Sequence, residues 1–427
     1  KENKPISTAG DKLKIGVTGA RCPQSIIELI EEFDGKIIHN LTCTGELNLP
    51  NLNPKAEKNL ISWYARSLLN TYPCMRMEDI DDRYQTIVES SKQLDGIIHH
   101  SVKFCDFYSF DYAYLKQKLD IPLLKIETDY TPQSEGQIRT RIEAFMESLG
   151  GKPSKTIKKQ SNKIVAGIDS GSLSTNVVIL DGNKNILSYS IVRTGAKSLD
   201  SAYRAFQEAL EKANLTEKQI SYVVSTGYGR ISIPFSRKNV TEITCHGKGA
   251  FHLNNKIRTI IDIGGQDSKV IRLDENGEVI DFAMNDKCSA GTGRFLEVMA
   301  KTLEIPLEEM GPESLNSREE ITITSMCTVF AESEVVSLIA QNKNKADLIN
   351  GINNSIASRT IALLERVGGK GAYMMTGGVA KNIGVLKALE NKIGEKIYVP
   401  EEPQIVGALG AALIALESLS EESKINQ

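Results

Sequence analysis

The chain has 427 residues, of which 41% are hydrophobic and 25% charged, and its formal net charge is −3. This length allows about two to four domains, while the near-neutral charge and the lack of any roughly 18–20-residue apolar run exclude nucleic acid and a membrane as expected partners. Seven scattered cysteines without a Cys-x-x-Cys pair, and an N-terminus without the apolar core of a signal peptide, favour a reduced cytoplasmic protein.

Short apolar segments alternate with helical patterns between residues 13 and 150. The expected strands lie at 14–19, 36–39, 96–100 and 122–126, and the expected helices at 24–33 and 133–149. Strands that alternate with helices predict an α/β domain in which helices cover both faces of a parallel sheet. We expect a polar tail at 1–12 and, because residues 151–163 contain five lysines and no acid, a solvated linker there.

Residues 164–418 contain a weak internal repeat. Each copy begins with a strand, at 164–168 and at 259–263, which ends at an Asp-x-Gly turn and leads into a β-hairpin. The period from Asp169 to Asp262 is too long for a solenoid, so it predicts two duplicated α/β halves that face each other across a cleft. Residues 419–427 are expected to form a second polar tail.

The two repeated turns could each hold part of a nucleotide. Asp169 and Asp262 stand at the carboxyl ends of strands, where a carboxylate can orient Mg²⁺ or its water while backbone N–H groups hold phosphate. Gln266 follows the second turn and is suited to orient an attacking water. Either turn alone could be a plain glycine turn, but two turns at equivalent places of a repeat favour nucleotide binding.

A third glycine turn, in residues 374–382, opens a predicted helix whose N-terminal amides could approach a ligand. Together the three loops resemble the superfamily of actin, sugar kinases and heat-shock chaperone ATPases, which implies two phosphate loops and an adenosine loop. A small-residue helix at 405–412 fits the closing helix of that superfamily, although close packing alone also explains it. The candidate nucleotide-binding residues are Gly171, Ser172, Leu173, Ser174, Thr175, Asn176, Gly264, Gly265, Gly377, Gly378, Lys381, Asn382 and Gln404.

Four stretches, at 225–230, 262–269, 285–293 and 327–334, carry a closer resemblance. They resemble the activator ATPases of 2-hydroxyacyl-CoA dehydratases and benzoyl-CoA reductases, and the resemblance covers essentially all of 164–418. It implies ATP, Mg²⁺ and one 4Fe-4S cluster per homodimer, with Cys288 and Cys327 of each subunit as ligands. Asn176 departs from the pattern, because that family usually has lysine after the first phosphate loop.

The number of thiolates and their predicted positions before helices also favour Cys288 and Cys327 as ligands. Two thiolates are half of the usual ligand set of such a cluster, and a second copy of the chain would supply the other half. Each cysteine precedes a predicted helix, whose positive N-terminal end favours a thiolate. The alternative for a single cysteine is a small buried apolar residue, which is the interpretation we give to Cys245.

Residues 13–150 resemble the C-terminal half of a 2-hydroxyacyl-CoA dehydratase subunit, through motifs around Cys43, Cys74, Cys105 and residues 126–130. That resemblance makes Cys105 the leading cluster ligand of this unit, with Cys43 and Cys74 as additional candidates. The remaining ligands would come from a half that this sequence does not contain. The alternative is that all three cysteines are buried residues of an α/β core.

The predicted function is therefore an ATP-dependent reductase. It would accept an electron from a ferredoxin or flavodoxin and pass it to a dehydratase-like or reductase-like iron–sulfur acceptor. Asp169 and Asp262 would hold Mg²⁺ and water, with Gln266 assisting. Two alternatives stay open: a small-molecule kinase of the sugar-kinase superfamily, and a non-catalytic ATP sensor.

Overall fold

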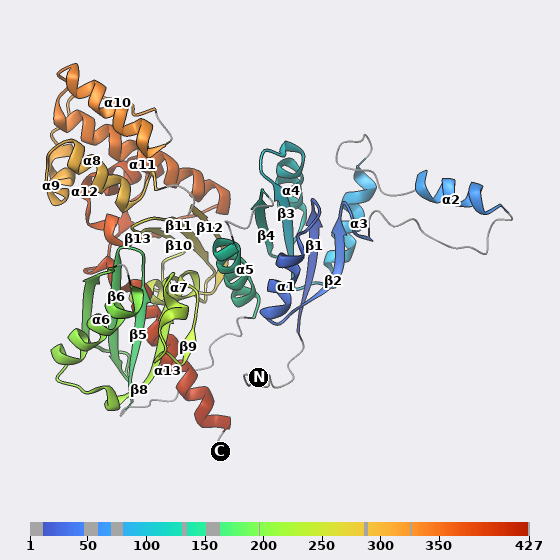
Figure 1. Cartoon of the computed structure of the whole chain (residues 1–427), viewed down its shortest axis with the longest axis horizontal. Helices are drawn as coiled ribbons and strands as arrows, with labels where there is room; N and C mark the ends of the chain where they lie inside the picture. Colours follow the sequence, from blue (N-terminus) through green and yellow to red (C-terminus); the bar gives the residue numbers. More distant parts are fainter. Residues whose placement is uncertain are drawn as a thin grey trace. The chain divides into compact units, whose positions relative to one another are not determined.

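The computed structural model describes residues 12–46, 59–69, 80–129, 135–150, 163–195, 197–285, 289–324 and 327–425. The chain divides into two compact units, Lys1–Gly151 and Lys152–Gln427, each considered by itself below (Figure 1). Residues 1–11, most of the expected linker, Cys74 and Cys288 lie outside the described residues.

The first unit is built on a four-stranded parallel sheet in the order β2-β1-β3-β4. Its strands are β1 (Leu13–Gly19), β2 (Gly35–Thr42), β3 (Gly96–Val102) and β4 (Leu123–Thr128). All four match the strands expected from the sequence. The carboxyl ends of parallel strands share one edge of the sheet, so the segments that follow them, including those with Cys43 and Cys105, start from the same edge.

Helices cover both faces of this sheet. On one face, the side chains of Ile30 in α1 (Gln24–Glu32) and Met146 in α5 (Glu135–Gly150) approach Gly35. On the other, Ile87 in α3 (Asp81–Ser91) and Leu115 in α4 (Asp106–Lys118) pack in one cluster with the strands. The sequence did not lead us to expect α3, α4 or α2 (Leu60–Leu69), because the first two mix apolar and charged residues without a clear helical period.

The second unit contains two five-stranded sheets of the same design, in the orders β7-β6-β5-β8-β9 and β12-β11-β10-β13-β14. In each, an antiparallel hairpin lies on one side of the first strand and parallel strands lie on the other. The first sheet comprises β5 (Ile164–Ser170), β6 (Ser174–Asp181), β7 (Ile186–Arg193), β8 (Ile220–Thr226) and β9 (Lys238–Asn239). The second comprises β10 (Thr259–Ile263), β11 (Ser268–Leu273), β12 (Val279–Asn285), β13 (Tyr373–Thr376) and β14 (Ile397–Tyr398).

Strand register confirms the duplication. Asp169 pairs with Asn176 across the first hairpin, and Asp262 pairs with Lys269 across the second. The unit is therefore an α/β fold of two duplicated halves, as the internal repeat predicts. The register also makes Asn176 and Lys269 equivalent positions of the two halves.

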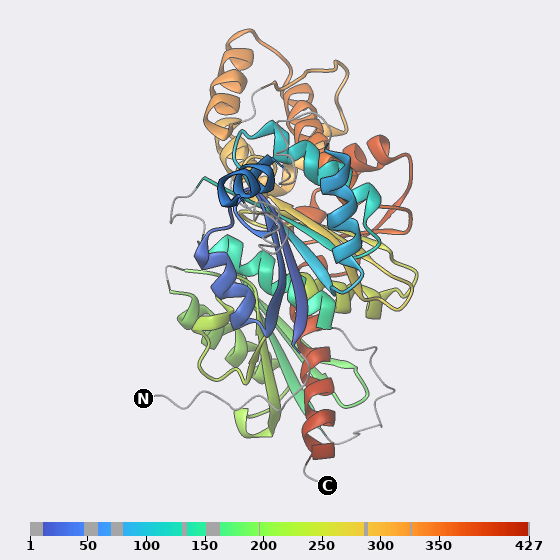
Figure 2. The same cartoon turned by 90° about the vertical axis from the view of Figure 1, so that its right-hand side faces the viewer.

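Two helices pack between the sheets. α13 (Val406–Ile425) lies against β5 and β8 of the first sheet, α7 (Glu242–Leu253) lies against the second, and the two helices contact each other. Figure 2 shows α13 in red, running along the first sheet. The opposite face of that sheet is covered by α6 (Ser198–Lys212), whose Phe206 joins Ile168 in one apolar cluster.

α13 is long and apolar enough to pass as a membrane span, but 83% of that window is buried inside the protein. Its glycines explain the close fit, since a Cβ on Gly410 would overlap the carbonyl oxygen of Cys245 in α7. The helix also continues through much of the expected tail at 419–427, because Leu419 packs into the same core. Cys245 is fully buried, as its structural interpretation requires.

The second half carries the remaining helices, around a core that includes Phe295, Met299 and Ile352. These helices are α8 (Gly293–Thr302), α9 (Leu307–Ser314), α10 (Thr328–Ala340), α11 (Lys345–Val367) and α12 (Ile383–Ile393). α8 follows β12 and α10 begins directly after Cys327, so both helices connect the candidate cluster segments to this core.

Candidate functional site

A cavity of about 460 Å³ lies between the two halves of the second unit. Both repeated turns and the third glycine turn contribute to its wall. Of the candidate nucleotide-binding residues, those lining the cavity are Gly171, Ser172, Leu173, Ser174, Asn176, Gly264, Gly265, Gly377, Gly378, Lys381, Asn382 and Gln404. The three loops that were chosen from sequence alone therefore surround one space.

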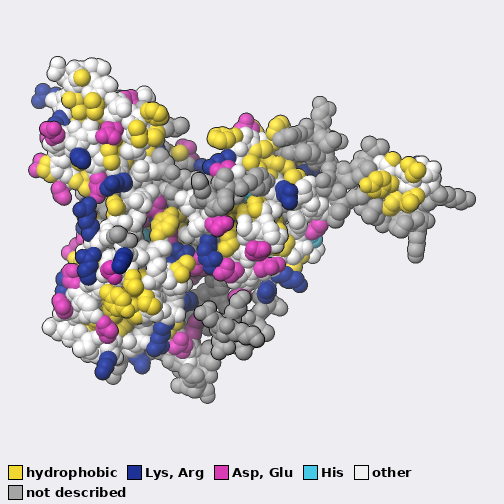
Figure 3. Space-filling view, in the orientation of Figure 1, with side chains coloured by type: hydrophobic (Ala, Val, Ile, Leu, Met, Phe, Trp, Pro, Cys, Tyr) yellow, Lys and Arg dark blue, Asp and Glu magenta, His cyan; other side chains and the backbone are white. Residues whose placement is uncertain are grey.

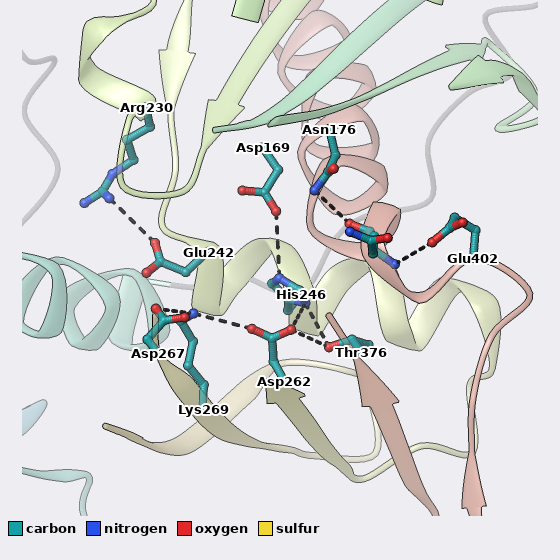
Figure 4. A network of polar contacts seen from close by, with 11 residues as sticks. Asp169, Asn176, Arg230, Glu242, His246, Asp262, Asp267, Lys269, Thr376 and Glu402 are labelled. Atoms are coloured by element: carbon teal, nitrogen blue, oxygen red, sulfur yellow. Dashed lines mark hydrogen bonds and ion pairs between the residues drawn. The ribbon is translucent and has the colours of Figure 1, made fainter. Parts of the chain in front are cut away.

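Asp169 and Asp262 approach this space from opposite halves, with His246 of α7 between them (Figure 4). The imidazole Nε2 lies 4.0 Å from Asp169 Oδ2, and Nδ1 lies 3.7 Å from Asp262 Oδ1. Thr376, at the end of β13, donates a hydrogen bond of 2.9 Å to Asp262 Oδ1. The two carboxylates thus face one ring from the two sides of the cleft, as the repeat predicted for the pair.

The two carboxylates differ in their electrostatic surroundings. Burial raises the pKa of Asp169 to about 6, an effect that His246 only partly offsets. Burial would raise the pKa of Asp262 too, but His246, Lys269 and the Thr376 hydrogen bond outweigh it and hold that pKa below its ordinary value. Asp262 is therefore the more firmly ionised of the pair, and Asp169 the one whose charge depends on pH.

Lys269 provides a buried cation at this end of the cavity. Its Nζ lies 2.7 Å from Asp267 Oδ2 and 3.4 Å from Asp262 Oδ2. Burial would lower the pKa of Lys269, but the neighbouring carboxylates, Asp267 first, raise it well above its ordinary value. Because Lys269 is the register equivalent of Asn176, the second half supplies a lysine where the first half has none.

Asn176 instead ties the first hairpin to the C-terminal segment. Its Nδ2 donates a 3.0 Å hydrogen bond to the backbone carbonyl of Gln404. Its Oδ1 is buried and accepts no hydrogen bond from the described residues. Nearby, Lys381 donates to Glu402 at 2.9 Å, and Glu402 in turn accepts from the backbone N–H of Gln404. These contacts join the third loop to the start of α13.

Two sequence candidates lie elsewhere. Thr175 is fully buried and bonds to the hydroxyls of Thr194 and Ser201, so it belongs to the core of the first half. Gln266 is exposed and is absent from the residues that line the cavity. The position of its side chain therefore gives no support to a water-orienting role.

Glu242 and His246 line the cavity and were both missed. They stand one turn apart at the beginning of α7, so both face the cleft. Their spacing of four residues places both side chains on one face of a helix, but it does not show what that face contacts.

The phosphate loop of the second half is joined to the segment that follows Cys288. The backbone N–H groups of Gly293 and Arg294, the first residues of α8, donate to the carbonyl oxygens of Gly264 and Gly265 at 2.9 and 2.8 Å. A movement of the loop would therefore be passed directly to α8.

The two candidate ligand segments meet. The hydroxyl of Ser289 lies 3.2 Å from that of Thr328, so the residues next to Cys288 and Cys327 in the sequence are in contact. Cys327 itself is exposed and occupies the N-cap position of α10, where its thiol makes no capping hydrogen bond. An accessible thiol at a helix N-terminus is a suitable setting for a thiolate ligand, and the described part of this segment fits the implied cluster.

The first unit shows a less complete arrangement. Cys43 and Cys105 are both half-buried, and Cys105 occupies the N-cap position of α4 without a side-chain capping hydrogen bond. Beside it, Lys103 pairs with Asp129 at 2.5 Å. Within the described residues no group of three or more His, Cys, Asp and Glu side chains is arranged to hold a metal.

Comparisons with known proteins match both units. The signature of the BadF/BadG/BcrA/BcrD ATPase family covers residues 166–415, and that of the 2-hydroxyglutaryl-CoA dehydratase D-component covers 1–149. The 2-hydroxyisocaproyl-CoA dehydratase activator of Clostridioides difficile is 43% identical over 258 residues, which are 60% of this chain and 97% of the relative. For the first unit, the (R)-phenyllactyl-CoA dehydratase beta subunit of Clostridium sporogenes is 43% identical over 72 residues, 16% of this chain and 19% of the relative.

A solved structure agrees. The activator of the 2-hydroxyisocaproyl-CoA dehydratase from Clostridium difficile with bound ADPNP is similar with a TM-score of 0.59 and 42% identity, covering 62% of this chain and 98% of the other. These matches confirm the resemblance drawn from the four motif stretches. The chain belongs to the BadF/BadG/BcrA/BcrD ATPase family, and it carries a dehydratase D-component-like unit before the ATPase.

Proposed function

We propose that residues 164–418 couple ATP hydrolysis to the transfer of one low-potential electron to an iron–sulfur partner that resembles a 2-hydroxyacyl-CoA dehydratase. The observation that carries the proposal is the contact between Ser289 and Thr328, because it joins the two cysteine segments beside a phosphate loop. Family membership supports the ATPase part, and the names of the relatives, activators of dehydratases, support the partner.

In the nucleotide cleft, Asp169 and Asp262 would hold Mg²⁺ through its water ligands, while the glycine loops bind the phosphates with backbone N–H groups. Lys269 would offset part of the phosphate charge through its position beside Asp262. Hydrolysis at such a site rests mainly on positioning and charge stabilisation. Loss of the terminal phosphate would release the loop at Gly264 and Gly265, and with it the start of α8.

Cys288 and Cys327 would be the protein ligands of the implied 4Fe-4S cluster, and a second copy of the chain would supply the other two. Such a cluster stores one electron at low potential, which no side chain of the cleft can do. Val329, Phe330 and Val336 on α10 are between 51% and 68% exposed next to Cys327, and Figure 3 shows hydrophobic side chains over α10. A second subunit would cover this surface.

The electron donor would be a ferredoxin or flavodoxin, in a reducing, cytoplasmic setting. The first unit, being similar to a dehydratase component, would place an acceptor-like module on the same chain as the ATPase. Whether it carries a cluster of its own depends on Cys105 and its neighbours.

The test is ATP-dependent electron transfer. The chain, prepared without oxygen and reduced with dithionite, is mixed with a purified iron–sulfur dehydratase component, and reduction of that component is followed by EPR. We expect reduction only with Mg-ATP. An acceptor that is reduced to the same extent without ATP, or a phosphorylated small molecule as the product, would contradict the proposal.

A further inference from the structure

Glu242 is a buried carboxylate of the nucleotide cavity whose oxygens accept no hydrogen bond from the described residues. It is the first residue of α7 and only 3% exposed. The nearest cation is Arg230, whose Nη1 lies 3.6 Å from Oε2, an ion pair beyond hydrogen-bond distance. Buried carboxylates ordinarily have hydrogen-bond partners, since leaving one without them is costly. Both oxygens of Glu242 therefore have unused hydrogen-bonding capacity at the wall of the cavity.

The carboxylate lies among charged side chains from both halves of the unit. In Figure 4 it projects from α7 between Arg230 on one side and Asp267 with Lys269 on the other. Its charge influences the pKa of Asp169 and of Lys269, so the three groups share one electrostatic environment. Both phosphate loops line the same cavity as Glu242, so a water held by this carboxylate would lie in the proposed nucleotide space.

Arg230 lies close enough to Glu242 to orient its carboxylate by charge, but it does not donate a hydrogen bond to either oxygen. The guanidinium is 3% exposed and its Nη1 donates a 3.1 Å hydrogen bond to the carbonyl of Gly227, in the turn after β8. Its position is thus fixed by the backbone. A base whose orientation is set by a third group, while its own oxygens stay available, is the arrangement used in general base catalysis.

We propose that Glu242 is the general base of ATP hydrolysis and that Arg230 is its positioning residue; this inference rests on the ATP hydrolysis proposed above. Glu242 accepts a hydrogen bond from the attacking water and takes its proton as the water oxygen bonds to the γ-phosphorus. The bond from that phosphorus to the bridging oxygen breaks, and its electron pair leaves with ADP. The proton then passes from Glu242 to solvent or to the released phosphate.

The other buried acidic groups of the cavity, Asp169, Asp262 and Asp267, each have a charged neighbour, and the remaining lining carboxylates, Glu297 and Glu308, are not buried. Asp262 accepts from Thr376 and pairs with Lys269, and Asp267 pairs with the same lysine. Asp169 faces His246, and we assign it to Mg²⁺. Glu242 is left as the carboxylate of this cavity that combines burial with two oxygens lacking hydrogen bonds among the described residues.

The test is steady-state ATP hydrolysis by the full chain, prepared without oxygen, as wild type and as Glu242→Gln. We expect kcat to fall by about 10²–10⁴-fold, with the Kd for Mg-ADPNP changed by less than about threefold. The matched control is Glu417→Gln, which removes an ion pair of 2.8 Å with Lys248 of the same helix, outside the cavity. This control should hydrolyse ATP at the wild-type rate.

Two further variants separate catalysis from packing. Glu242→Asp keeps the charge but shortens the side chain, whereas Glu242→Gln keeps the size but loses the charge. A base predicts more activity in Glu242→Asp than in Glu242→Gln, and a packing role predicts the reverse. Arg230→Lys should lower kcat less than Glu242→Gln does, and the double variant Arg230→Lys/Glu242→Gln should be no slower than Glu242→Gln alone, because the arginine acts through the glutamate.

A kcat of Glu242→Gln within about threefold of wild type would overturn the inference. So would folded Glu242→Gln that no longer binds Mg-ADPNP, which would make Glu242 part of the nucleotide or metal site instead. Should Glu242→Gln not fold, the comparison of Glu242→Asp and Arg230→Lys decides. Failure of the proposed function gives a different pattern, in which the wild type itself hydrolyses no ATP or hydrolyses it without reducing an acceptor.

Discussion

The hydroxyl groups of Ser289 and Thr328 lie 3.2 Å apart, although 39 positions separate them in the sequence. Ser289 follows Cys288 and Thr328 follows Cys327, so this contact fixes the spacing of the two segments proposed to ligate the cluster. On the other side, Gly293 and Arg294 bond to the phosphate loop at Gly264 and Gly265. The phosphate loop is thus bonded to the start of α8, four residues after Ser289, the residue that contacts Thr328.

Replacing Cys327 should separate the two proposed activities. We expect Cys327→Ser to lose the protein-bound iron and any EPR signal of the reduced protein while keeping ATP hydrolysis, because Cys327 does not line the nucleotide cavity. The control is Cys245→Ala, at a buried cysteine with no proposed ligand role, which should retain iron. Full iron content in Cys327→Ser would rule out its role as a ligand.

Nucleotide affinity should depend on pH through Asp169. Its pKa is raised by burial to about 6, and Mg²⁺ requires the ionised carboxylate, so below that pH binding must first remove a proton. The Kd for Mg-ADPNP should be constant at higher pH and rise by about tenfold per unit below about pH 6. Equilibrium binding of Mg-ADPNP at pH values from about 5 to about 8 measures this dependence. Asp169→Asn should show no such break, and a break that persists in that variant would assign it to another group.

The same raised pKa has a consequence for stability. Because the folded-state pKa of Asp169 lies above the ordinary value of 3.8, the fold favours the protonated carboxyl. This contribution to stability is fully present below the ordinary pKa and is lost as the pH rises through about 6. At neutral pH the ionised carboxylate of Asp169 is therefore disfavoured by its burial, and shifts of this kind are common at binding sites.

Nucleotide affinity should depend on the side-chain amide of Asn176. In Asn176→Asp the donor to the Gln404 carbonyl becomes an acceptor, and a negative charge is added to a cavity that already holds several carboxylates. We expect affinity for Mg-ADPNP to fall by about tenfold or more, because the added carboxylate repels the phosphate groups at short range in a poorly solvated cavity. Thr175→Ser, a neighbouring change outside the cavity, should leave the affinity as it is. Equal affinities in both variants would argue against a role for Asn176.

In the first unit, stability should depend on one buried ion pair. Arg83 makes two hydrogen bonds, of 3.0 and 3.1 Å, to Asp111, and the two side chains are 4% and 0% exposed. Breaking such a pair costs about 3–5 kcal/mol because it leaves a buried charge uncompensated. Asp111→Asn should therefore destabilise this unit strongly.

The comparison is Glu32→Gln, which removes the partner of Arg139 in an exposed pair. Exposed pairs contribute about 0–1 kcal/mol, so the unfolding midpoint of this unit in urea should hardly move. Equal midpoints for Glu32→Gln and Asp111→Asn would show that the buried pair is not what stabilises the α3–α4 face of the sheet.

Much of the fold of the second unit could be predicted from the sequence, because the same order of elements occurs in both copies of the repeat. The apolar strands before Asp169 and Asp262 are each followed by a glycine turn and a hairpin, and this order alone placed the two carboxylates at equivalent positions. The same argument put the three loops around one cavity. Local patterns of this kind are strong when two copies agree.

The residues that were missed depend on packing that has no local signature. Glu242 and His246 reach the cavity because α7 packs between the two sheets. The sequence of α7 alone does not predict that packing. Gln266 was chosen for its chemistry, yet its place in the turn leaves it exposed. In the first unit, α4 was not expected because aromatic and charged residues alternate around the whole helix, so its buried side is set by the sheet rather than by a helical period.

The most direct test of the account is an EPR spectrum of the dithionite-reduced full chain, prepared without oxygen, with and without Mg-ATP. The account predicts about two iron atoms per chain, a signal of a reduced 4Fe-4S cluster, and a change of that signal when Mg-ATP is added. A colourless, iron-free protein that still hydrolyses ATP would contradict the coupling of ATP to electron transfer.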